Sequence, residues 1–196
     1  MGLTGAAVIT GLAIVALLAI VRARAHRRRR WAAGAAGERA TAAILEGLEG
    51  RGFIALHDRR IPGMDRANFD HIVVGPTGVF TVETKRFAGR VTLRGRLGSG
   101  LGRLRPRHNG KPIDHVVDQA HHQADALDRT LGHGRTVTPL VVIHNAELTQ
   151  PRFRRPITDG VRWCSADDLP QVLRRGSARL SRRRVRAVAD ALDRAL

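Results

Sequence analysis

Two runs of β-forming residues joined by a short turn constrain the fold more than any other feature of this sequence. The runs cover residues 69–74 and 79–85, and positions 75–78 between them read Gly-Pro-Thr-Gly. Pro76 requires a negative φ, and Gly78 suits the last position of a type I turn, so the pattern predicts a β-hairpin. The fold must therefore contain a sheet built around this antiparallel pair.

The turn also sets the register of the hairpin. Residues whose numbers sum to 153 then face each other, which places Asp70 opposite Glu83 with Cβ atoms about 5 Å apart. Side chains alternate along a strand, so Lys85 shares the face of Glu83. A bulge that shifts the register by one would still leave both carboxylates within reach of one ion. Two carboxylates this close repel each other, and we therefore expect a cation between them.

Mg²⁺, or Mn²⁺ in its place, suits this arrangement because it takes oxygen ligands and combines one or two carboxylates with waters and substrate phosphate. We expect Asp70 and Glu83 to be ligands, with the carbonyl of Thr84 as a third. The metal would activate a bound water, while Lys85 orients that water or stabilises the transition state. Lys85 is one of two lysines among 34 basic residues, and arginine is a poor substitute where a proton is handled. The predicted reaction is phosphodiester hydrolysis.

The same residues have a second interpretation. Asp70, Glu83, Thr84 and Lys85 would also suit the solvated face of a hairpin, with a weak surface ion pair between Asp70 and Lys85. Spacing alone favours this simpler interpretation, so the choice depends on the further observations below.

The rest of the chain predicts an α/β fold, in which a mixed β-sheet is flanked by helices. Apolar residues at helical spacing predict helices over residues 34–50, 113–131 and 181–196. Ser165 and Asp168 resemble a capping box that opens a shorter helix ending at Leu173. We expect further strands over residues 53–58, 90–93, 137–143 and 161–164, and loops over residues 59–66 and 95–111, the second loop mobile and basic.

The N-terminal stretch predicts a membrane anchor. Residues 1–21 carry no charged side chain, and residues 3–21 are long enough as a helix to cross a hydrocarbon layer of about 30 Å. A cleaved signal peptide is the alternative, but its positive charge would precede the apolar stretch. Here the charge follows it, as Arg22, Arg24, Arg27, Arg28, Arg29 and Arg30. By the positive-inside rule we expect one pass through the inner membrane, with the C-terminal domain in the cytoplasm.

The net charge of +17 indicates a polyanionic partner, either nucleic acid or an anionic membrane. For the arginine cluster at residues 22–30 we favour membrane lipid headgroups, with nucleic acid as the alternative. The excess of arginine over lysine also suggests a GC-rich coding bias, which would account for part of the charge. Cys164 is the sole cysteine, so the chain has no intramolecular disulfide and no cysteine-based zinc site.

Ligand-type side chains also lie along the predicted helix at residues 113–131. A zinc site there is conceivable, but solvated polar positions with helix pairs explain the pattern more simply. The residues concerned are His115, Asp118, His121, His122 and Asp125.

The sequence resembles the nuclease-related domain family, NERD, over about residues 33–143. The matching segments are Gly37-Glu38-Arg39, residues 70–80 (DHIVVGPTGVF), residues 82–85 (VETK) and Gly89. NERD is assigned to the PD-(D/E)xK nuclease superfamily, so the resemblance implies a restriction-endonuclease-like fold. It implies a metal-dependent nuclease that acts on nucleic acid, with DNA as the first expectation.

On this resemblance Asp70, Glu83 and Lys85 match the signature of the superfamily. Glu38 would be its acidic residue on the first helix, and Gln119 its glutamine on a later helix. Without the resemblance, Glu38 is a helix N-terminal acid and Gln119 a polar residue beside an apolar stripe. Phe69 replaces the proline that commonly precedes the aspartate. A catalytically inactive, membrane-tethered module that binds nucleic acid or acts as an adaptor is therefore the alternative.

These expectations divide the chain into four parts. Residues 1–21 form the transmembrane helix, and residues 22–32 form a basic juxtamembrane linker. Residues 33–145 form the nuclease-like core, and residues 146–196 supply a strand and helices that complete it.

Overall fold

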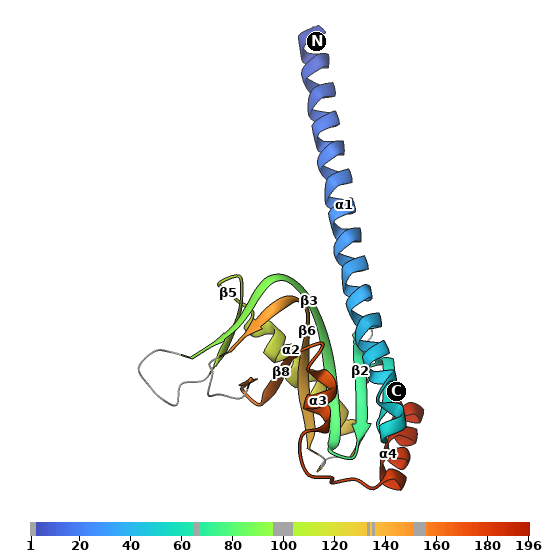
Figure 1. Cartoon of the computed structure of the whole chain (residues 1–196). Helices are drawn as coiled ribbons and strands as arrows, with labels where there is room; N and C mark the ends of the chain where they lie inside the picture. The colour runs from blue at the N-terminus through green and yellow to red at the C-terminus, as the bar shows by residue number, and fades with distance from the viewer. Residues whose placement is uncertain (1–2, 65–66, 96–103, 133, 135, 151–155) are drawn as a thin grey trace. The chain divides into compact units, whose positions relative to one another are not determined.

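A computed structural model of the chain describes residues 3–64, 67–95, 104–132, 134, 136–150 and 156–196 (Figure 1). The side chains of residues 3–15 and 30 lie outside this description. The chain divides into two compact units, Met1–Ala36 and Gly37–Leu196.

The first element is a single helix, α1 (Leu3–Glu46), which runs without a break through residues 22–33. That segment is composed largely of alanine and arginine, two strong helix formers, so nothing in it ends the helix. The helix predicted to begin at residue 34 is therefore the last part of α1. Most of the predicted membrane span, residues 3–21, has side chains outside the described part. Within the described part, no helix is long and apolar enough to cross a membrane.

The second unit contains a mixed sheet of eight strands, as the α/β prediction required. Its main path runs in the order β1-β2-β3-β6-β8-β7, with β3–β6 and β6–β8 parallel and the other pairs antiparallel. Strand β4 pairs with the far end of β3, and β5 pairs with β4. The strands are β1 (Ile54–Arg60), β2 (Asn68–Gly75), β3 (Gly78–Arg94), β4 (Arg105–His108), β5 (Lys111–Pro112), β6 (Val137–Thr149), β7 (Ile157–Thr158) and β8 (Val161–Ser165).

The predicted hairpin and its register are confirmed. Strands β2 and β3 pair from Gly75–Gly78 to His71–Val82, and every pair sums to 153. Gly75 lies where Phe53 covers the hairpin, since a Cβ atom at this position would be 2.1 Å from Phe53 Cδ1. A glycine is thus required for the close approach of the preceding segment.

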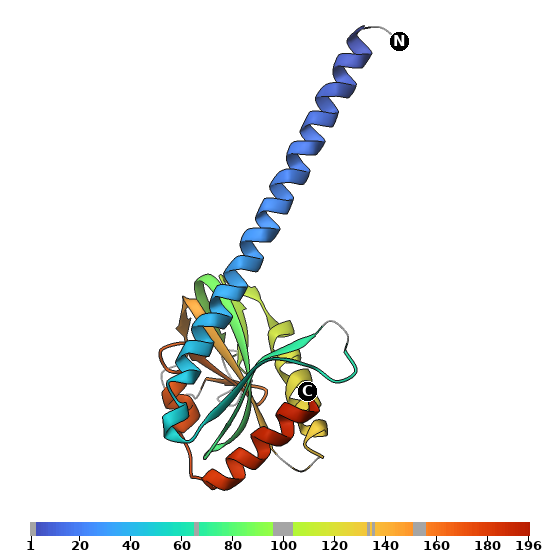
Figure 2. The same cartoon turned by 90° about the vertical axis from the view of Figure 1, so that its right-hand side faces the viewer.

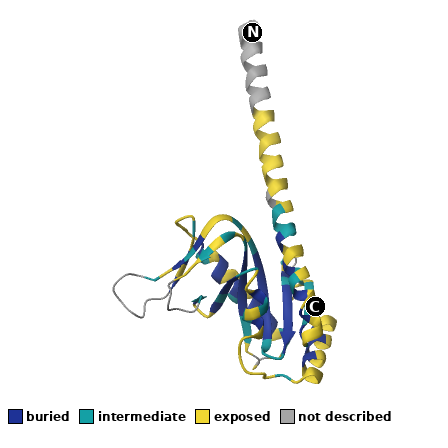
Figure 3. Ribbon diagram, viewed as in Figure 1, coloured by how far each residue is buried: buried dark blue, intermediate teal, exposed yellow. Residues whose placement is uncertain are grey.

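Helices cover both faces of the sheet. Helices α2 (Asp114–Thr130) and α4 (Arg182–Ala195) pack on one face, with α4 against β1 and β2 (Figure 2). Helix α3 (Leu169–Arg174) and the end of α1 pack on the other. The central strands are consequently buried on both sides (Figure 3), which explains their near-continuous apolar runs. Ser181 caps α4, because its Oγ accepts from the Arg184 amide at 3.3 Å.

Four details differ from the prediction. Residues 79–85 and 90–93 belong to one strand, β3, with an irregularity between Arg86 and Gly89. Strands β1 and β6 extend beyond the predicted ends, and β7 was not predicted. The predicted loop at 95–111 contains β4 and the start of β5, although residues 96–103 lie outside the described residues. The alternation in β4 was hidden because Pro106 is its only apolar residue.

Candidate active site

An acidic centre lies where the start of β2 runs beside β3, on the face that α2 covers. Glu83 and Lys85 come from β3 and point to the same side, as two-residue spacing requires. Glu83 is only 2% exposed, so its carboxylate must be satisfied by other groups of the protein. The remaining carboxylate of the centre, Asp70, comes from β2 and is partly buried.

Both oxygens of Glu83 accept hydrogen bonds. Lys85 Nζ donates to Oε1 at 2.5 Å, and Gln123 Nε2 donates to Oε2 at 2.6 Å. Lys85 Nζ also donates to Gln119 Oε1 at 3.1 Å. The Lys85 side chain is 25% exposed, so its ammonium lies at the edge between the buried carboxylate and solvent.

Asp70 occupies a break in the backbone pairing. The β2–β3 ladder stops at His71–Val82, and the β1–β2 ladder has no pair at Asp58–Asp70, where Asp58 has a φ of 50°. The carboxylate takes over part of the missing pairing, because Asp70 Oδ2 accepts from the Thr84 amide at 2.8 Å. This bond holds Asp70 against the segment that carries Glu83 and Lys85.

The charge balance around Asp70 is unfavourable to its ionised form. Burial is the largest cause and the neighbouring carboxylate of Glu83 the next, and together they raise the pKa of Asp70 to about 7. The Thr84 amide and the Lys85 ammonium act in the opposite direction and offset this only in part. The donors around Asp70 therefore stabilise its ionised form only in part.

Glu38, on α1, also belongs to the surroundings of this centre. It lies in the interior of α1, so it is not a helix N-terminal acid. Its side chain is exposed, but its charge contributes to the raised pKa of Asp70. Among the predicted site residues, Asp70, Glu83, Lys85 and Gln119 are linked by direct hydrogen bonds or by the Thr84 amide. Glu38 reaches the group through electrostatics alone.

Thr84 points away from the acidic centre, to the other face of the sheet. Its Oγ1 donates to Thr41 Oγ1 at 3.1 Å, and Thr41 Oγ1 lies 2.8 Å from His144 Nε2. Thr41 is fully buried on α1, and His144 comes from β6. The network ties three elements to the residue whose amide holds Asp70.

A histidine pair, of which His71 is buried and His57 half-buried, lies on the strands next to the centre. His57 Nδ1 on β1 and His71 Nδ1 on β2 are 2.7 Å apart. His71 is 3% exposed, and burial, followed by the nearby His57 and His144, lowers its pKa to about 3. The folded chain thus holds this imidazole neutral at physiological pH.

The suggested zinc site on α2 has no support among the described residues. There, no group of three or more His, Cys, Asp or Glu side chains is placed to hold a metal ion. His115, Asp118, His122 and Asp125 are exposed, as the simpler interpretation of this helix requires.

Gln123 is the main site residue that sequence reasoning missed. It is 2% exposed and binds Glu83 directly, whereas the predicted Gln119 touches Lys85. The available signal was the position of Gln123 inside the apolar stripe of α2, between Ala120 and Ala124. A polar residue in such a stripe needs a buried partner, and here that partner is a carboxylate.

Comparison with known proteins identifies the family of the chain. The family model described as the nuclease-related domain, NERD, matches residues 33–144, more than half of the chain. No curated protein and no solved structure matched the sequence. The matched region contains Glu38, Asp70, Glu83, Lys85 and Gln123. The chain therefore belongs to the nuclease-related domain family, a member of the restriction-endonuclease-like superfamily.

Proposed function

We propose that this chain is a divalent-metal-dependent nuclease that hydrolyses phosphodiester bonds, with DNA as its first substrate. The observation that carries the proposal is the convergence of Asp70, Glu83 and Lys85 at one point of the sheet, where the negative charge is incompletely neutralised. A purely structural ion pair would require one carboxylate for one ammonium. The second carboxylate is the feature that a metal site explains.

The donor set suits Mg²⁺ or Mn²⁺. Asp70 and Glu83 offer carboxylate oxygens, and the repulsion that raises the pKa of Asp70 would be relieved by a cation between them. A divalent cation bound there would neutralise charge on the phosphate and activate a water. The proposed ligands therefore match both the chemistry and the electrostatics of the centre.

Thr84 is proposed as the third ligand through its carbonyl. In a paired strand, the N–H and C=O of one residue point toward the same neighbouring strand. The Thr84 amide points at Asp70, so its carbonyl is directed to the same side, beyond the last β2–β3 pair at His71–Val82. That carbonyl therefore lies outside the described β2–β3 ladder.

The other side chains have roles that follow from their contacts. Lys85, at the solvent edge, is placed to contact a phosphate oxygen or to orient the attacking water. Gln119 and Gln123 position Lys85 and Glu83, and Glu38 adds negative charge that favours cation binding. Each of these roles is compatible with the position that the side chain has in the structure.

The test is cleavage of plasmid and linear DNA by the full chain with Mg²⁺, with Mn²⁺ and with EDTA. Asp70→Ala and Lys85→Ala are expected to reduce the rate at least about a hundredfold, the scale of losing a group that acts in the transition state. The matched controls are Asp118→Ala, an exposed acid on α2, and Lys111→Ala, the only other lysine. Equal residual activity in the unmodified chain and both site variants would contradict the proposal.

A noncatalytic nucleic-acid-binding or adaptor module is the alternative. It is favoured by one observation: both oxygens of Glu83 are already bonded by Lys85 and Gln123 without any metal. This alternative predicts DNA binding that falls steeply with salt, and no turnover with either metal.

We also propose that residues 3–21 anchor the chain in the inner membrane and leave the second unit in the cytoplasm. The support is the uncharged sequence followed by six arginines, whose headgroup contacts would fix the orientation. The full chain is expected to stay in the membrane pellet after carbonate extraction, and Ile14→Arg/Leu17→Arg to release it. A C-terminal tag digested by protease added outside intact spheroplasts would contradict the orientation.

A further inference from the structure

Beyond the irregularity at residues 86–89, the far end of β3 pairs with β4 on one side and with the end of β6 on the other, and β3 and β4 form an antiparallel ribbon. One side of the ribbon is apolar: Val91, Leu93 and Leu104 are buried in the cluster that includes Val116 and Val117 of α2. Because side chains alternate, the other side of both strands faces away from this core. That outer side carries arginines.

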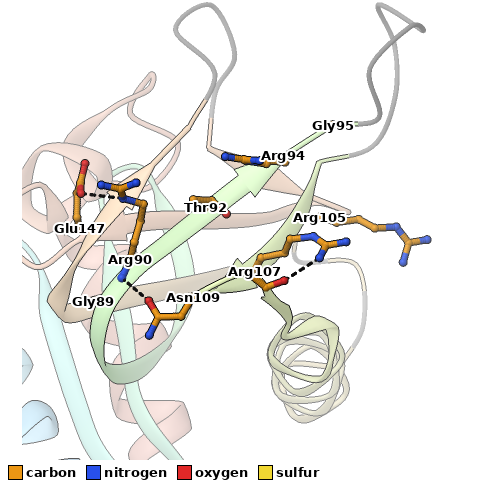
Figure 4. A pocket seen from close by; sticks show the side chains of 10 residues that line it. Gly89, Arg90, Thr92, Arg94, Gly95, Arg105, Arg107, Asn109 and Glu147 are labelled. Carbon is orange, nitrogen blue, oxygen red and sulfur yellow. Dashed lines mark hydrogen bonds and ion pairs between the residues drawn. The ribbon is translucent and has the colours of Figure 1, made fainter.

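The outer side of the ribbon borders a groove of about 1020 Å³ (Figure 4). Its polar side chains are mostly cationic, and among the described lining residues Glu147 is the one carboxylate. The arginines of the groove are Arg90 and Arg94 on β3 and Arg105 and Arg107 on β4.

The register of the ribbon places like charges opposite each other. Arg94 pairs with Arg105 across the two strands, and Arg107 pairs with Thr92. Directly opposed like charges destabilise a strand pair. An anion bound between Arg94 and Arg105 would remove this penalty, just as a cation would at the acidic centre.

The carboxylates near the groove neutralise it only weakly. Arg90 Nε lies 3.0 Å from Glu147 Oε2, and Arg105 Nη1 lies 3.5 Å from Asp114 Oδ1. The Arg90 and Arg105 side chains are 62% and 73% exposed, so both ion pairs are screened by water. Arg94 has no ion-pair partner among the described residues. The groove therefore keeps a positive potential that a ligand can use.

We propose that this arginine groove binds the phosphate backbone of the nucleic acid whose cleavage is proposed above, and this inference rests on that function. Arginine forks bind phosphate oxygens in pairs. Successive outward positions on a strand lie about 6.6 Å apart, which is the scale of neighbouring phosphates on one nucleic-acid strand. The ribbon thus presents a row of arginines that can contact several successive phosphates.

The position of the groove relative to Lys85 favours nucleic acid over lipid. Arg90 and Arg94 lie on the same strand as Lys85, roughly 15 Å and 30 Å further along it. The groove opens on the side of β3 that faces away from α2, whereas Lys85 faces α2. Only a ligand as long as a polymer can extend from one side to the other, and an isolated lipid headgroup would fill one site only. The groove is assigned to a flank of the cleaved bond, outside the acidic centre.

The test measures binding of the full chain, in nonionic detergent, to fluorescent duplex DNA over a range of salt, with EDTA present to prevent cleavage. Arg94→Ala/Arg105→Ala is compared with Arg183→Ala/Arg186→Ala, which removes the same charge from exposed positions on α4. The groove variant is expected to bind at least about tenfold more weakly, and its slope of log K against log salt to fall by about 2. The control is expected to lose less than half as much slope. Equal losses in both variants, or no loss in the groove variant, would overturn the proposal.

Folding is checked on the same samples. Removing two opposed arginines is expected to leave the Tm unchanged or slightly higher. A single Arg94→Glu variant keeps the Arg105–Asp114 ion pair and should also weaken DNA binding. This variant tests the groove if the double variant unfolds. Undiminished binding by Arg94→Glu would contradict the groove.

Two further comparisons distinguish the proposed DNA groove from the proposed nuclease activity and from a lipid site. Binding needs no turnover, so lost DNA binding with no cleavage by any sample supports the groove and contradicts the nuclease. Cleavage by the unmodified chain, with undiminished DNA binding by the groove variant, supports the nuclease and contradicts the groove. In flotation with phosphatidylglycerol-rich vesicles, the groove variant is expected to behave as the unmodified chain. Lost flotation with retained DNA binding would make the groove a lipid site and the proposal wrong.

Discussion

At the scale of single residues, the centre depends on buried polar groups whose partners come from other elements. Glu83 is an example, because its two oxygens are bonded by Lys85 on the same strand and by Gln123 on α2. Burying a carboxylate is costly unless its oxygens find donors. The side chains that satisfy Glu83 therefore affect stability and metal binding together.

Replacing Gln123 with leucine is expected to lower the stability of the fold and to weaken metal binding. The variant leaves the buried Glu83 Oε2 without its donor, at a cost of about 2 kcal/mol in the free energy of unfolding. Chemical denaturation should detect this loss, and titration with Mn²⁺ should show a weaker Kd. Gln171→Leu, at an exposed position of α3, is the control. If Gln123→Leu loses stability but keeps the Kd for Mn²⁺, Gln123 is structural only.

His71 is expected to make stability depend on acid pH. Its pKa is lowered to about 3 in the folded chain, so between about pH 6.5 and pH 3 the unfolded chain binds a proton that the folded chain does not. The free energy of unfolding should therefore fall as the pH falls through this range. Denaturation curves of His71→Asn should have a flatter pH profile than the unmodified chain, and those of His115→Asn, exposed on α2, an unchanged one. Equal slopes for all three would be the contrary result.

At the scale of elements, the hairpin positions the site and β3 extends it. Strand β3 carries Glu83 and Lys85 before the irregularity at residues 86–89 and the outer arginines after it. The turn at Gly75–Gly78 starts this strand in the register that brings Asp70 to the Thr84 amide. An error in the hairpin would thus displace the whole centre.

Gly75→Ala tests this dependence. The added Cβ would meet the ring of Phe53 at 2.1 Å, so the backbone must shift, with an expected destabilisation of about 2–3 kcal/mol. Adding Phe53→Ala to it should cost less than the two single changes together, because the double variant removes the clash. Gly50→Ala, where nothing lies within 4 Å of the new Cβ, is the control. Strict additivity in urea denaturation would show that the clash does not decide the loss.

At the scale of the whole molecule, opposite charges are separated within one unit. The chain has a net charge of +17, yet the carboxylate of Glu83 is buried, at 2% exposed. On the proposed function, the basic surface would attract a polyanion and the acidic centre would hold a cation.

Mg²⁺ is therefore expected to stabilise the second unit as a whole. At ten times its Kd the ion should add about 1.4 kcal/mol to the free energy of unfolding, and EDTA should reverse it. Asp70→Asn should be more stable than the unmodified chain in EDTA at pH 8, because it removes a buried repulsive charge, and should not respond to Mg²⁺. Thermal melts measure both effects.

Alkylation of Cys164 measures the effect of Mg²⁺ on unfolding independently of thermal melts. This thiol is 3% exposed, and burial followed by the charge of Asp168 raises its pKa to about 12, so labelling at pH 8 requires opening of the fold. Mg²⁺ should slow labelling of the unmodified chain and leave the Asp70→Asn rate unchanged. A Mg²⁺ response of the same size in both would place the ion elsewhere.

Local sequence determined the hairpin, its register and the shared face of Glu83 and Lys85. Turn chemistry and two-residue alternation act between near neighbours, so they can be read without knowing the rest of the fold. The same holds for the cap at Ser181 and the helical stripe of α2. These features carried the prediction of the acidic centre.

Tertiary structure alone decided which side chains complete that centre. Gln123 reaches Glu83 only because α2 crosses over β3, and Thr41 meets Thr84 only because α1 lies on the other face. The continuation of β3 past residues 86–89 depends on its pairing with β4 and β6, which hides an arginine-rich strand among apparent loop residues. The contacts of Gln123 with Glu83 and of Thr41 with Thr84 join residues 40 and 43 positions apart. They arise from packing of whole elements, which no local pattern specifies.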